Sequence, residues 1–369
     1  MKLCLIYNFA QHYRTNIFTL MDREFKCDFV FGDSMSDVKK MDYSLLSGNV
    51  TENHTYRFKG WTYQNGVIKQ LFKNYSHYII LGDTRSISTW LFLLLARCFC
   101  HNKKVCVWTH GWYGKEKTYE RWLKHLFFKL PNGVIFTYGN YAKELMIKEG
   151  FPQDKILPIH NSLAYDKQIT IRSQLTEADV YRCHFGNSNP NLFFVGRLTA
   201  VKNLDQILYA MHKSNIKGYK YNLTLIGGGE KYNELQKISK ELDLENQVWF
   251  YGPCYDEIEL SRLIYNADLC VAPGNIGLTA MHSLVFGTPA ITHNDYKWQM
   301  PEFEAIREGI TGTFFEKDNI EDLSNKIDDW LNSHSHDRAS IRQACMDEID
   351  RGWNPYYQLD ILKKGLNYE

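Results

Sequence analysis

One basic loop in the second half of the chain holds side chains suited to phosphate. It follows the apolar run Phe193-Phe194-Val195-Gly196 and carries Arg197 and Lys202, five residues apart. At the carboxyl end of a strand such a pair can clamp a diphosphate, because the guanidinium fork matches phosphate oxygens. A solvated basic loop is the alternative interpretation. We predict that this loop binds a diphosphate.

A second segment, Pro273 to Leu284, combines glycines with the start of a helix. Its first backbone amides would point at an anion with the helix dipole behind them, and a glycine allows a phosphate to approach closely. One turn further on, His282 can reach a ribose or sugar hydroxyl, although a lone helical histidine is more often structural. The predicted anion-binding residues here are Gly277, Leu278 and Thr279.

Short apolar runs that alternate with longer amphipathic stretches must position these loops. This alternation is typical of parallel α/β sheets, and it occurs twice, which predicts two Rossmann-like domains facing a cleft. The predicted strands are Leu3–Tyr7, Cys27–Phe31, Tyr78–Leu81, Lys104–Trp108, Gly133–Thr137 and Leu157–His160 in the first half, and Leu192–Val195, Tyr221–Ile226, Val248–Tyr251, Leu269–Ala272 and Pro289–Thr292 in the second.

These patterns give a division into four parts. Residues 1–165 are predicted to form an N-terminal Rossmann-like domain, and 166–190, a polar stretch, to connect the two domains. Residues 191–350 are predicted to form the C-terminal Rossmann-like domain. The apolar side chains of 351–369 predict a last helix that packs back on the N-terminal domain.

The second half resembles the donor domain of the GT-B glycosyltransferases grouped as family 4. The resemblance covers about residues 190–330 and rests on an ordered set of motifs: Gly196-Arg197-Leu198 with Lys202, Gly227-Gly228-Gly229, Phe250-Tyr251-Gly252, Ala267-Asp268-Leu269 to Pro273, Gly277-Leu278, Gly287-Thr288-Pro289 and Gly309-Ile310-Thr311-Gly312. The ordered set is far more specific than any one element. It implies the GT-B architecture, with residues 1–165 as the acceptor-side domain and residues 191–350 as the nucleotide-sugar donor domain.

This sequence departs from the family at its two acidic positions. The family carries glutamates on either side of the Gly-Leu turn, where this chain has Gly274 and His282. The resemblance implies that His282 takes the ribose role. Glu302 and Glu304 are the nearest acidic side chains that can serve the donor sugar.

The first half resembles the family more loosely. His110 follows a predicted strand, and the resemblance implies that it faces the donor sugar and the acceptor. Asn161 lies where relatives have the sequence Asn-Gly-Val. In the first strand-to-helix loop, where relatives carry glycines, His12 and Arg14 are expected either to contact phosphate or acceptor or to be structural.

The resemblance implies sugar transfer with retention and without a metal or other cofactor. The sequence contains no Asp-x-Asp motif, so protein groups must stabilise the departing diphosphate. The predicted function is transfer of a sugar to a glycan or lipid-linked glycan acceptor in bacterial surface-polysaccharide assembly. The alternatives are a nucleotide-sugar epimerase or hydrolase of the same fold, and a non-catalytic nucleotide-sugar or glycan-binding relative.

Composition bears on partners and location. A net charge of +1 gives no reason to expect a nucleic acid partner, and nine scattered cysteines indicate free thiols in a reducing, cytoplasmic setting. The apolar run Ile87–Cys100 is too short for a membrane span and is predicted to be a buried helix. The cationic and aromatic segment 114–130 is expected either to touch the inner face of a membrane or to pack on the first sheet.

Overall fold

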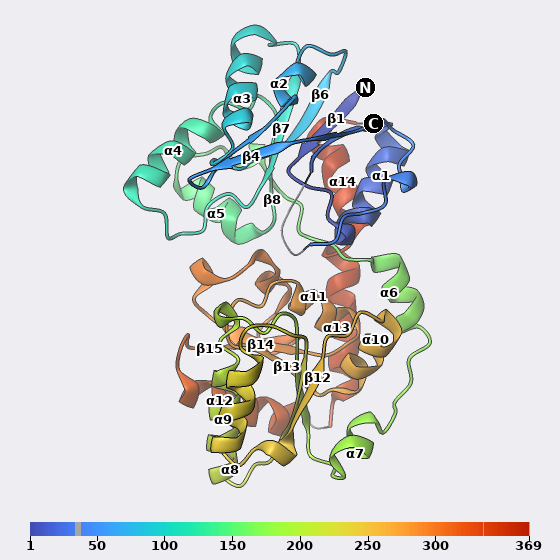
Figure 1. Cartoon of the computed structure of the whole chain (residues 1–369), viewed down its shortest axis with the longest axis vertical. Helices are drawn as coiled ribbons and strands as arrows, with labels where there is room; N and C mark the ends of the chain where they lie inside the picture. Colours follow the sequence, from blue (N-terminus) through green and yellow to red (C-terminus); the bar gives the residue numbers. More distant parts are fainter. Residues whose placement is uncertain (34–37, 335, 369) are drawn as a thin grey trace. The chain divides into compact units, whose positions relative to one another are not determined.

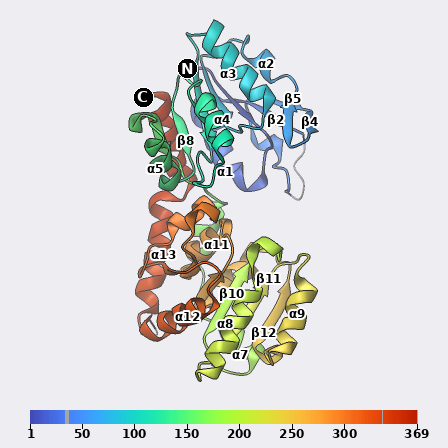
Figure 2. The same ribbon diagram turned by 90° about the vertical axis from the view of Figure 1, so that its left-hand side faces the viewer.

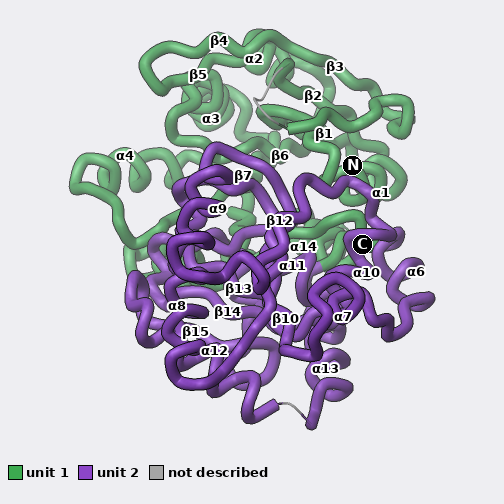
Figure 3. Tube along the Cα trace, turned by 60° about the horizontal axis from the view of Figure 1, so that its bottom comes forward, with its two compact units in different colours: residues 1–165, 354–369 green, residues 166–353 purple. Residues whose placement is uncertain are grey.

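The computed structural model describes residues 1–33, 38–334 and 336–368, and the chain divides into two compact units. Unit 1 comprises residues 1–165 and 354–369, and unit 2 comprises residues 166–353 (Figure 3). Each unit is built on a parallel sheet with helices around it (Figure 1). The predicted α/β class, with two successive Rossmann-like units, is confirmed.

Seven parallel strands form the sheet of unit 1, in the order β3-β2-β1-β6-β7-β8-β9. They read as nearly continuous apolar runs because helices bury both faces of a parallel sheet. The strands are β1 (Leu3–Tyr7), β2 (Asp28–Gly32), β3 (Val50–Asn53), β6 (His77–Leu81), β7 (Lys104–Thr109), β8 (Ile135–Thr137) and β9 (Ile156–Pro158), and the helices are α1 (Thr15–Phe25), α2 (Val67–Gln70), α3 (Ile87–Phe99), α4 (Thr118–Phe128), α5 (Asn140–Lys148) and α14 (Pro355–Leu366).

A small antiparallel hairpin, β4 (Thr55–Phe58) and β5 (Trp61–Gln64), stands outside this sheet. It is attached to the start of α3: the amide of Thr62 donates to the carbonyl of Arg85 at 2.9 Å, and the amide of Gln64 to Oγ of Ser88 at 3.1 Å. The sequence patterns did not predict the hairpin, because several of its apolar side chains are exposed aromatic rings.

Unit 2 has six parallel strands in the order β12-β11-β10-β13-β14-β15, and helices lie on both faces of the sheet (Figure 2). The strand order reverses between β10 and β13, so the loops after these two strands diverge at the carboxyl edge of the sheet. The strands are β10 (Asn191–Val195), β11 (Asn222–Ile226), β12 (Val248–Gly252), β13 (Leu269–Ala272), β14 (Ala290–His293) and β15 (Gly312–Phe315), and the helices are α6 (Tyr165–Arg172), α7 (Val180–Phe185), α8 (Asp205–Ile216), α9 (Tyr232–Glu241), α10 (Glu257–Asn266), α11 (Leu278–Val285), α12 (Ile320–His334) and α13 (Arg338–Gly352).

The polar stretch 166–190 contains helices α6 and α7 and bonds to the rest of unit 2. Arg172 forms a bidentate ion pair with Asp350, with N···O distances of 3.1 and 2.8 Å. The hydroxyl of Tyr181 donates to the carbonyl of Leu263 at 2.7 Å. The stretch therefore forms part of unit 2 in the structure.

The last helix, α14, packs against unit 1, beside α1 (Figure 1). Leu359, Leu362 and Leu366 enter the same buried cluster as the apolar side chains of α1. Gln358 accepts a hydrogen bond from Oγ of Ser162 at 2.6 Å and donates one to the carbonyl of His160 at 3.0 Å. The end of the chain thus completes the core of unit 1.

Truncating this contact should destabilise the protein. Leu362 is fully buried, so Leu362→Ala is expected to lower the free energy of unfolding by about 2–5 kcal/mol in urea titrations. Lys364→Ala, on the exposed side of the same helix, should change it by no more than about 0.5 kcal/mol. Equal stability of the two variants would contradict the assigned packing of α14.

Candidate active site

The predicted diphosphate loop and glycine-rich turn follow the two strands at which the sheet order of unit 2 reverses. Arg197 and Lys202 come after β10, and Gly274 to Thr279 come after β13. Lys202 joins the two loops, since its Nζ donates to the backbone oxygen of Asn275 at 2.6 Å and to Oδ1 of Asn275 at 2.8 Å. The structure therefore brings these two predicted segments together at one edge of the sheet.

Lys202 carries its charge in a largely buried position. Burial lowers the pKa of Lys202 to about 8, Glu302 acts in the opposite direction, and the nearby Arg197 lowers the pKa further. A pKa of about 8 leaves the ammonium group mostly protonated at neutral pH. Arg197 is exposed to solvent at the same loop. One fixed and one exposed cation thus lie at this edge.

Close backbone contacts explain the glycines of this edge. A Cβ on Gly274 would lie 2.1 Å from the carbonyl oxygen of Val201, and a Cβ on Gly227 would lie 1.9 Å from that of Gly196. Neither position has room for a side chain. The absence of the family's first glutamate at Gly274 therefore has a physical reason in this chain: the loop that carries Lys202 occupies its place.

Helix α11 begins at the same edge. Gly277 precedes it with φ 53° and ψ −143°, a conformation that favours glycine, and the hydroxyl of Thr279 donates to the carbonyl of Val195 at 2.8 Å. The hydroxyl bond fixes the first turn of α11 to the end of β10. The amides of Leu278 and Thr279 lie in the first helical turn, where backbone donors have no intrahelical acceptor.

The proposed ribose and sugar residues lie on two neighbouring elements. His282 lies on α11 and is partly exposed. Glu302 and Glu304 lie on the short 3₁₀ helix Pro301–Ala305, which packs against α11. Glu302 is buried and raises the pKa of Lys202, so the structure places it within electrostatic reach of that lysine. Glu304 is partly exposed.

Two further polar residues, Gln299 and His293, lie at the carboxyl edge of the unit 2 sheet. No motif in the sequence pointed to either of them. Gln299 accepts a hydrogen bond from the amide of Ile276 at 3.0 Å and donates to the hydroxyl of Thr292 at 2.8 Å. It therefore holds the glycine-rich turn to β14. At the end of β14, burial lowers the pKa of His293 to about 4, so this imidazole is neutral near pH 7.

In unit 1, Arg14 lies inside a cage of aromatic rings. Its guanidinium carbon is 5.2–5.6 Å from the ring centres of Tyr7, Tyr13, Trp108 and Tyr138. Its Nη2 donates to the hydroxyl of Tyr138 at 2.7 Å, whereas Nε and Nη1 have no hydrogen-bond partner among the described residues. The cation is thus stabilised by ring faces and one phenol.

His110 lies against this cage. Its ring centre is 4.5 Å from that of Tyr138 and 6.0 Å from that of Tyr113, with which it is stacked. Burial, and then the positive charges of Arg14 and Lys124, lower the pKa of His110 to about 4. The imidazole is therefore neutral at physiological pH and can donate or accept a hydrogen bond.

The other two predicted residues of unit 1 lie outside the aromatic cage. His12 is exposed, and its Nδ1 is 3.2 Å from the carbonyl oxygen of Lys39. Asn161 is buried, and its Oδ1 accepts a hydrogen bond from the amide of Ser162 at 3.1 Å. Among the described residues, the structure shows no contact of His12 or Asn161 with His110.

The segment 114–130 divides between core and surface. Phe127 and Phe128 of α4 are buried in unit 1, and Lys124 donates to Glu116 and to the carbonyl of Gly111, each at 2.7 Å. These bonds hold the loop that follows His110. Exposed apolar side chains of the same helix are Tyr119, Trp122 and Leu126. None of the helices in the described ranges combines the length and apolar content needed to cross a membrane.

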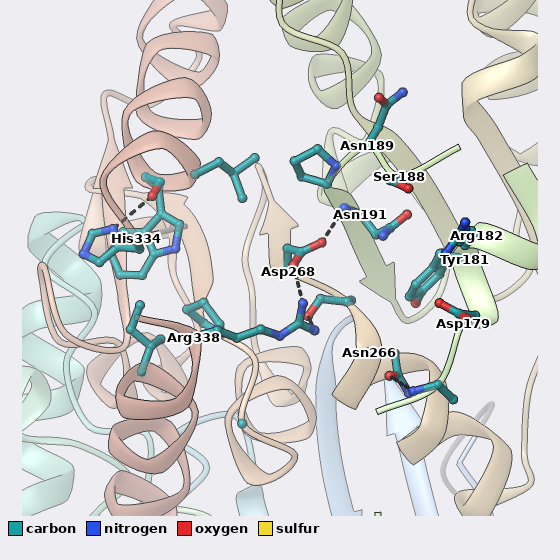
Figure 4. Close-up of a pocket in the computed structure, with 18 of the residues that line it drawn as sticks. Asp179, Tyr181, Arg182, Ser188, Asn189, Asn191, Asn266, Asp268, His334 and Arg338 are labelled. Atoms are coloured by element: carbon teal, nitrogen blue, oxygen red, sulfur yellow. Dashed lines mark hydrogen bonds and ion pairs between the residues drawn. The ribbon is translucent and has the colours of Figure 1, made fainter. Parts of the chain in front are cut away.

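A separate cavity of about 440 Å³ lies at the opposite, amino edge of the unit 2 sheet (Figure 4). At its centre Asp268 pairs with Arg338 at 2.5 Å and accepts a hydrogen bond from the amide of Asn191 at 2.7 Å. Because these groups satisfy one another, we assign the cavity a structural role and place the candidate active site at the carboxyl edge.

Comparison with known proteins identifies the domain that carries these loops. Residues 184–345 match the family described as glycosyl transferases group 1. The chain carries a glycosyl transferases group 1 domain. This group 1 domain includes both cationic positions and the glycine-rich turn, so the resemblance inferred from residues 190–330 is confirmed.

Curated relatives of the chain are distant. It is 26% identical over 217 residues to an uncharacterized 41.2 kDa protein in cps region of Klebsiella pneumoniae, covering 57% of this chain and 54% of that protein. It is 25% identical over 247 residues to an uncharacterized glycosyltransferase of Methanocaldococcus jannaschii, covering 63% and 58%. The chain thus spans a little over half the length of these relatives.

Solved structures show the same fold along the whole chain. The apo form of the lipopolysaccharide outer core galactosyltransferase WaaB has a TM-score of 0.73 at 14% identity, and Anabaena HepE in complex with UDP has 0.72 at 13%, each covering 100% of both chains. A putative UDP-N-acetylglucosamine 2-epimerase from Listeria monocytogenes has 0.62 at 14%, covering 100% and 98%. The predicted GT-B fold is confirmed.

The tight contact at Gly274 can be tested directly. Gly274→Ala places a methyl group against the carbonyl of Val201 and should displace the Lys202 loop, lowering the melting temperature by several degrees. Gly228→Ala is a matched control at the same edge, because its Cβ would meet only the ring of Pro253, at 3.2 Å. Full stability of Gly274→Ala in calorimetry would contradict the close approach of the two loops.

The partly buried, neutral His110 predicts a pH-dependent stability. Its pKa in the folded state, about 4, lies below the value of about 6.5 for an unfolded histidine, so the unfolded state binds more protons between these values. Stability should therefore fall as the pH drops from about 6.5 to 4, by about 1–3 kcal/mol from this residue. In urea titrations across this range, His110→Gln should show a weaker dependence; an unchanged dependence would contradict the assignment.

Proposed function

We propose that the chain transfers a sugar from a nucleotide-diphosphate sugar to a glycan or lipid-linked glycan acceptor. The observation that carries the proposal is the junction of the Lys202 loop and the turn before α11 at the point where the sheet order of unit 2 reverses. Such points bind nucleotides in open α/β sheets. Two cations and first-turn amides are available there for an anionic ligand.

In this proposal Arg197, Lys202 and the amides of Gly277, Leu278 and Thr279 bind the donor diphosphate. They stabilise the negative charge that develops on it as the sugar departs, so no metal ion or other cofactor is needed. Because Lys202 is already fixed to Asn275, it requires little reorganisation during the reaction. His282 binds the ribose, and Glu302 or Glu304 binds the donor sugar.

His110 is proposed to orient the acceptor or a donor-sugar hydroxyl as a neutral hydrogen-bonding group. Its low pKa argues against a role as general acid near pH 7. Gly274 leaves no space for a nucleophilic carboxylate at that position. We propose that transfer proceeds with retention of configuration. It does not pass through a covalent intermediate on a side chain at position 274. His12, Arg14 and Asn161 are assigned to the acceptor or phosphate side as part of the same proposal.

The comparisons support a biological setting for this activity. Relatives of the same fold include a lipopolysaccharide galactosyltransferase and an Anabaena protein crystallised with UDP. We propose that the chain acts in bacterial surface-polysaccharide assembly at the cytoplasmic face of a membrane, with UDP-sugars as the first donors to test. The exposed Tyr119, Trp122 and Leu126 of segment 114–130 are suited to peripheral membrane contact.

The likeness to an epimerase keeps epimerisation as the second candidate.

Nucleotide binding tests the donor site. Arg197→Ala should weaken UDP binding about ten- to hundredfold, because a charged hydrogen bond to phosphate contributes about 1.5–3 kcal/mol. Isothermal titration calorimetry with UDP, GDP, ADP, CMP and dTDP would measure it. The control Lys237→Ala removes an exposed lysine paired with Glu241 and should bind like the unmodified protein. Selective binding that survives Arg197→Ala unchanged would contradict the phosphate role of this arginine.

A further inference from the structure

The hairpin β4–β5 exposes aromatic rings that a water-soluble surface does not require. Phe58 is 72% exposed, Tyr56 56% and Trp61 38%. The hairpin is nevertheless well held, because its second strand donates hydrogen bonds to the loop before α3 and to the first turn of that helix. Rigid, exposed rings at a fixed place indicate a binding surface more than a loosely packed core.

These rings line a groove of about 410 Å³ whose surface is almost entirely apolar. Ile87, at the start of α3, closes one side of it. The outer face of α3 continues the apolar surface through Leu91 and Leu94, which are 39% and 42% exposed. The prediction of a buried helix at 87–100 is thus correct for one face of α3 and wrong for the other. The groove suits a hydrocarbon chain.

A second cavity, of about 740 Å³, adjoins this groove at Trp61, which lines both. The basic residues of its lining are Lys59, Arg85, Lys115 and Lys124, and the acidic residues are Asp83, Glu116 and Glu120. Glu116 is compensated by Lys124 at 2.7 Å, and Asp83 accepts from the amide of Arg85 at 2.9 Å. Lys59 lies over the ring of Phe58, at 5.3 Å. With Lys124 paired to Glu116, the lining of this second cavity keeps Lys59, Arg85 and Lys115 against Asp83 and Glu120.

The second cavity also reaches the candidate catalytic residue of unit 1. Tyr113 lines the cavity and is stacked on His110. The loops that supply Asp83 to Arg85 and Tyr113 to Glu116 follow β6 and β7, so they lie at the carboxyl edge of the sheet, as His110 does. An apolar groove, a polar cavity that presents Lys59 and Arg85, and His110 therefore follow one another along unit 1.

We propose that this pair of cavities binds an amphiphilic acceptor, a prenyl-type lipid phosphate that carries the glycan to be extended. The hydrocarbon tail lies in the groove of Tyr56, Phe58 and Trp61. The phosphate lies near Lys59 and Arg85, and the sugar lies toward Tyr113. This inference rests on the proposed transferase function and narrows its acceptor from any glycan to a lipid-linked one.

Binding of farnesyl phosphate, a short prenyl phosphate, tests the proposal. Phe58→Ser should weaken its binding to the full-length protein at least about tenfold in calorimetry, because the tail loses an aromatic contact. Lys59→Gln should weaken farnesyl phosphate several-fold and leave farnesol, which lacks the phosphate, unaffected. Phe72→Ser is the matched control: Phe72 is 70% exposed on unit 1 but lines neither cavity, so this variant should bind like the unmodified protein.

Three results would overturn the proposal. The first is that Phe58→Ser binds farnesyl phosphate as tightly as Phe72→Ser does. The second is that inorganic phosphate binds as tightly as farnesyl phosphate. The third is that Phe58→Ser loses only adsorption to phosphatidylcholine–phosphatidylglycerol vesicles, which would make the hairpin a membrane contact. UDP binding, measured on the same samples, reports on the donor site in unit 2. Its absence would count against the proposed transferase function and not against the lipid site.

Discussion

The close approach of two loops at the carboxyl edge of unit 2 is the constraint on which the candidate donor site depends. The loop after β10 can touch the loop after β13 only because Gly274 has no side chain, and the contact is closed by the bonds from Lys202 to Asn275. The hydrogen bond from the hydroxyl of Thr279 to the carbonyl of Val195 holds the start of α11 at the same edge. A partly buried cation and helical amides are thereby fixed before any ligand arrives, with the exposed Arg197 on the same loop. Such preorganisation is what stabilising a leaving diphosphate requires.

Much of the fold could be predicted because parallel strands buried on both faces read as continuous apolar runs. All eleven predicted strands correspond to strands of the two main sheets, with small shifts at their ends. The hairpin β4–β5 was missed because its exposed rings obey no burial pattern. Helices α6 and α7 were missed because they are short, and their hold on unit 2 depends on polar bonds such as that of Arg172 to Asp350.

The position of the candidate donor loops could be predicted because each loop is contiguous in sequence. The Arg197 loop and the turn before α11 carry ordered motifs, so their place after β10 and β13 followed from the strand pattern. Contacts between distant segments left no such signal. The aromatic cage of Arg14 takes Trp108 and Tyr138 from other strands and loops, and only the folded chain shows that it lies beside His110. Burial, and then the charges of Arg14 and Lys124, keep that imidazole neutral.

The central claim is that the bound nucleotide sugar loses its sugar to an acceptor. The most direct measurement follows release of UDP from UDP-glucose and UDP-galactose, with and without a lipid-linked glycan fraction, and analyses the products by mass spectrometry. We predict UDP release that depends on the acceptor fraction, with one hexose added to a lipid-linked product. Release of UDP without acceptor, or conversion of the donor to an isomeric nucleotide sugar with no transfer, would contradict the account and favour a hydrolase or an epimerase.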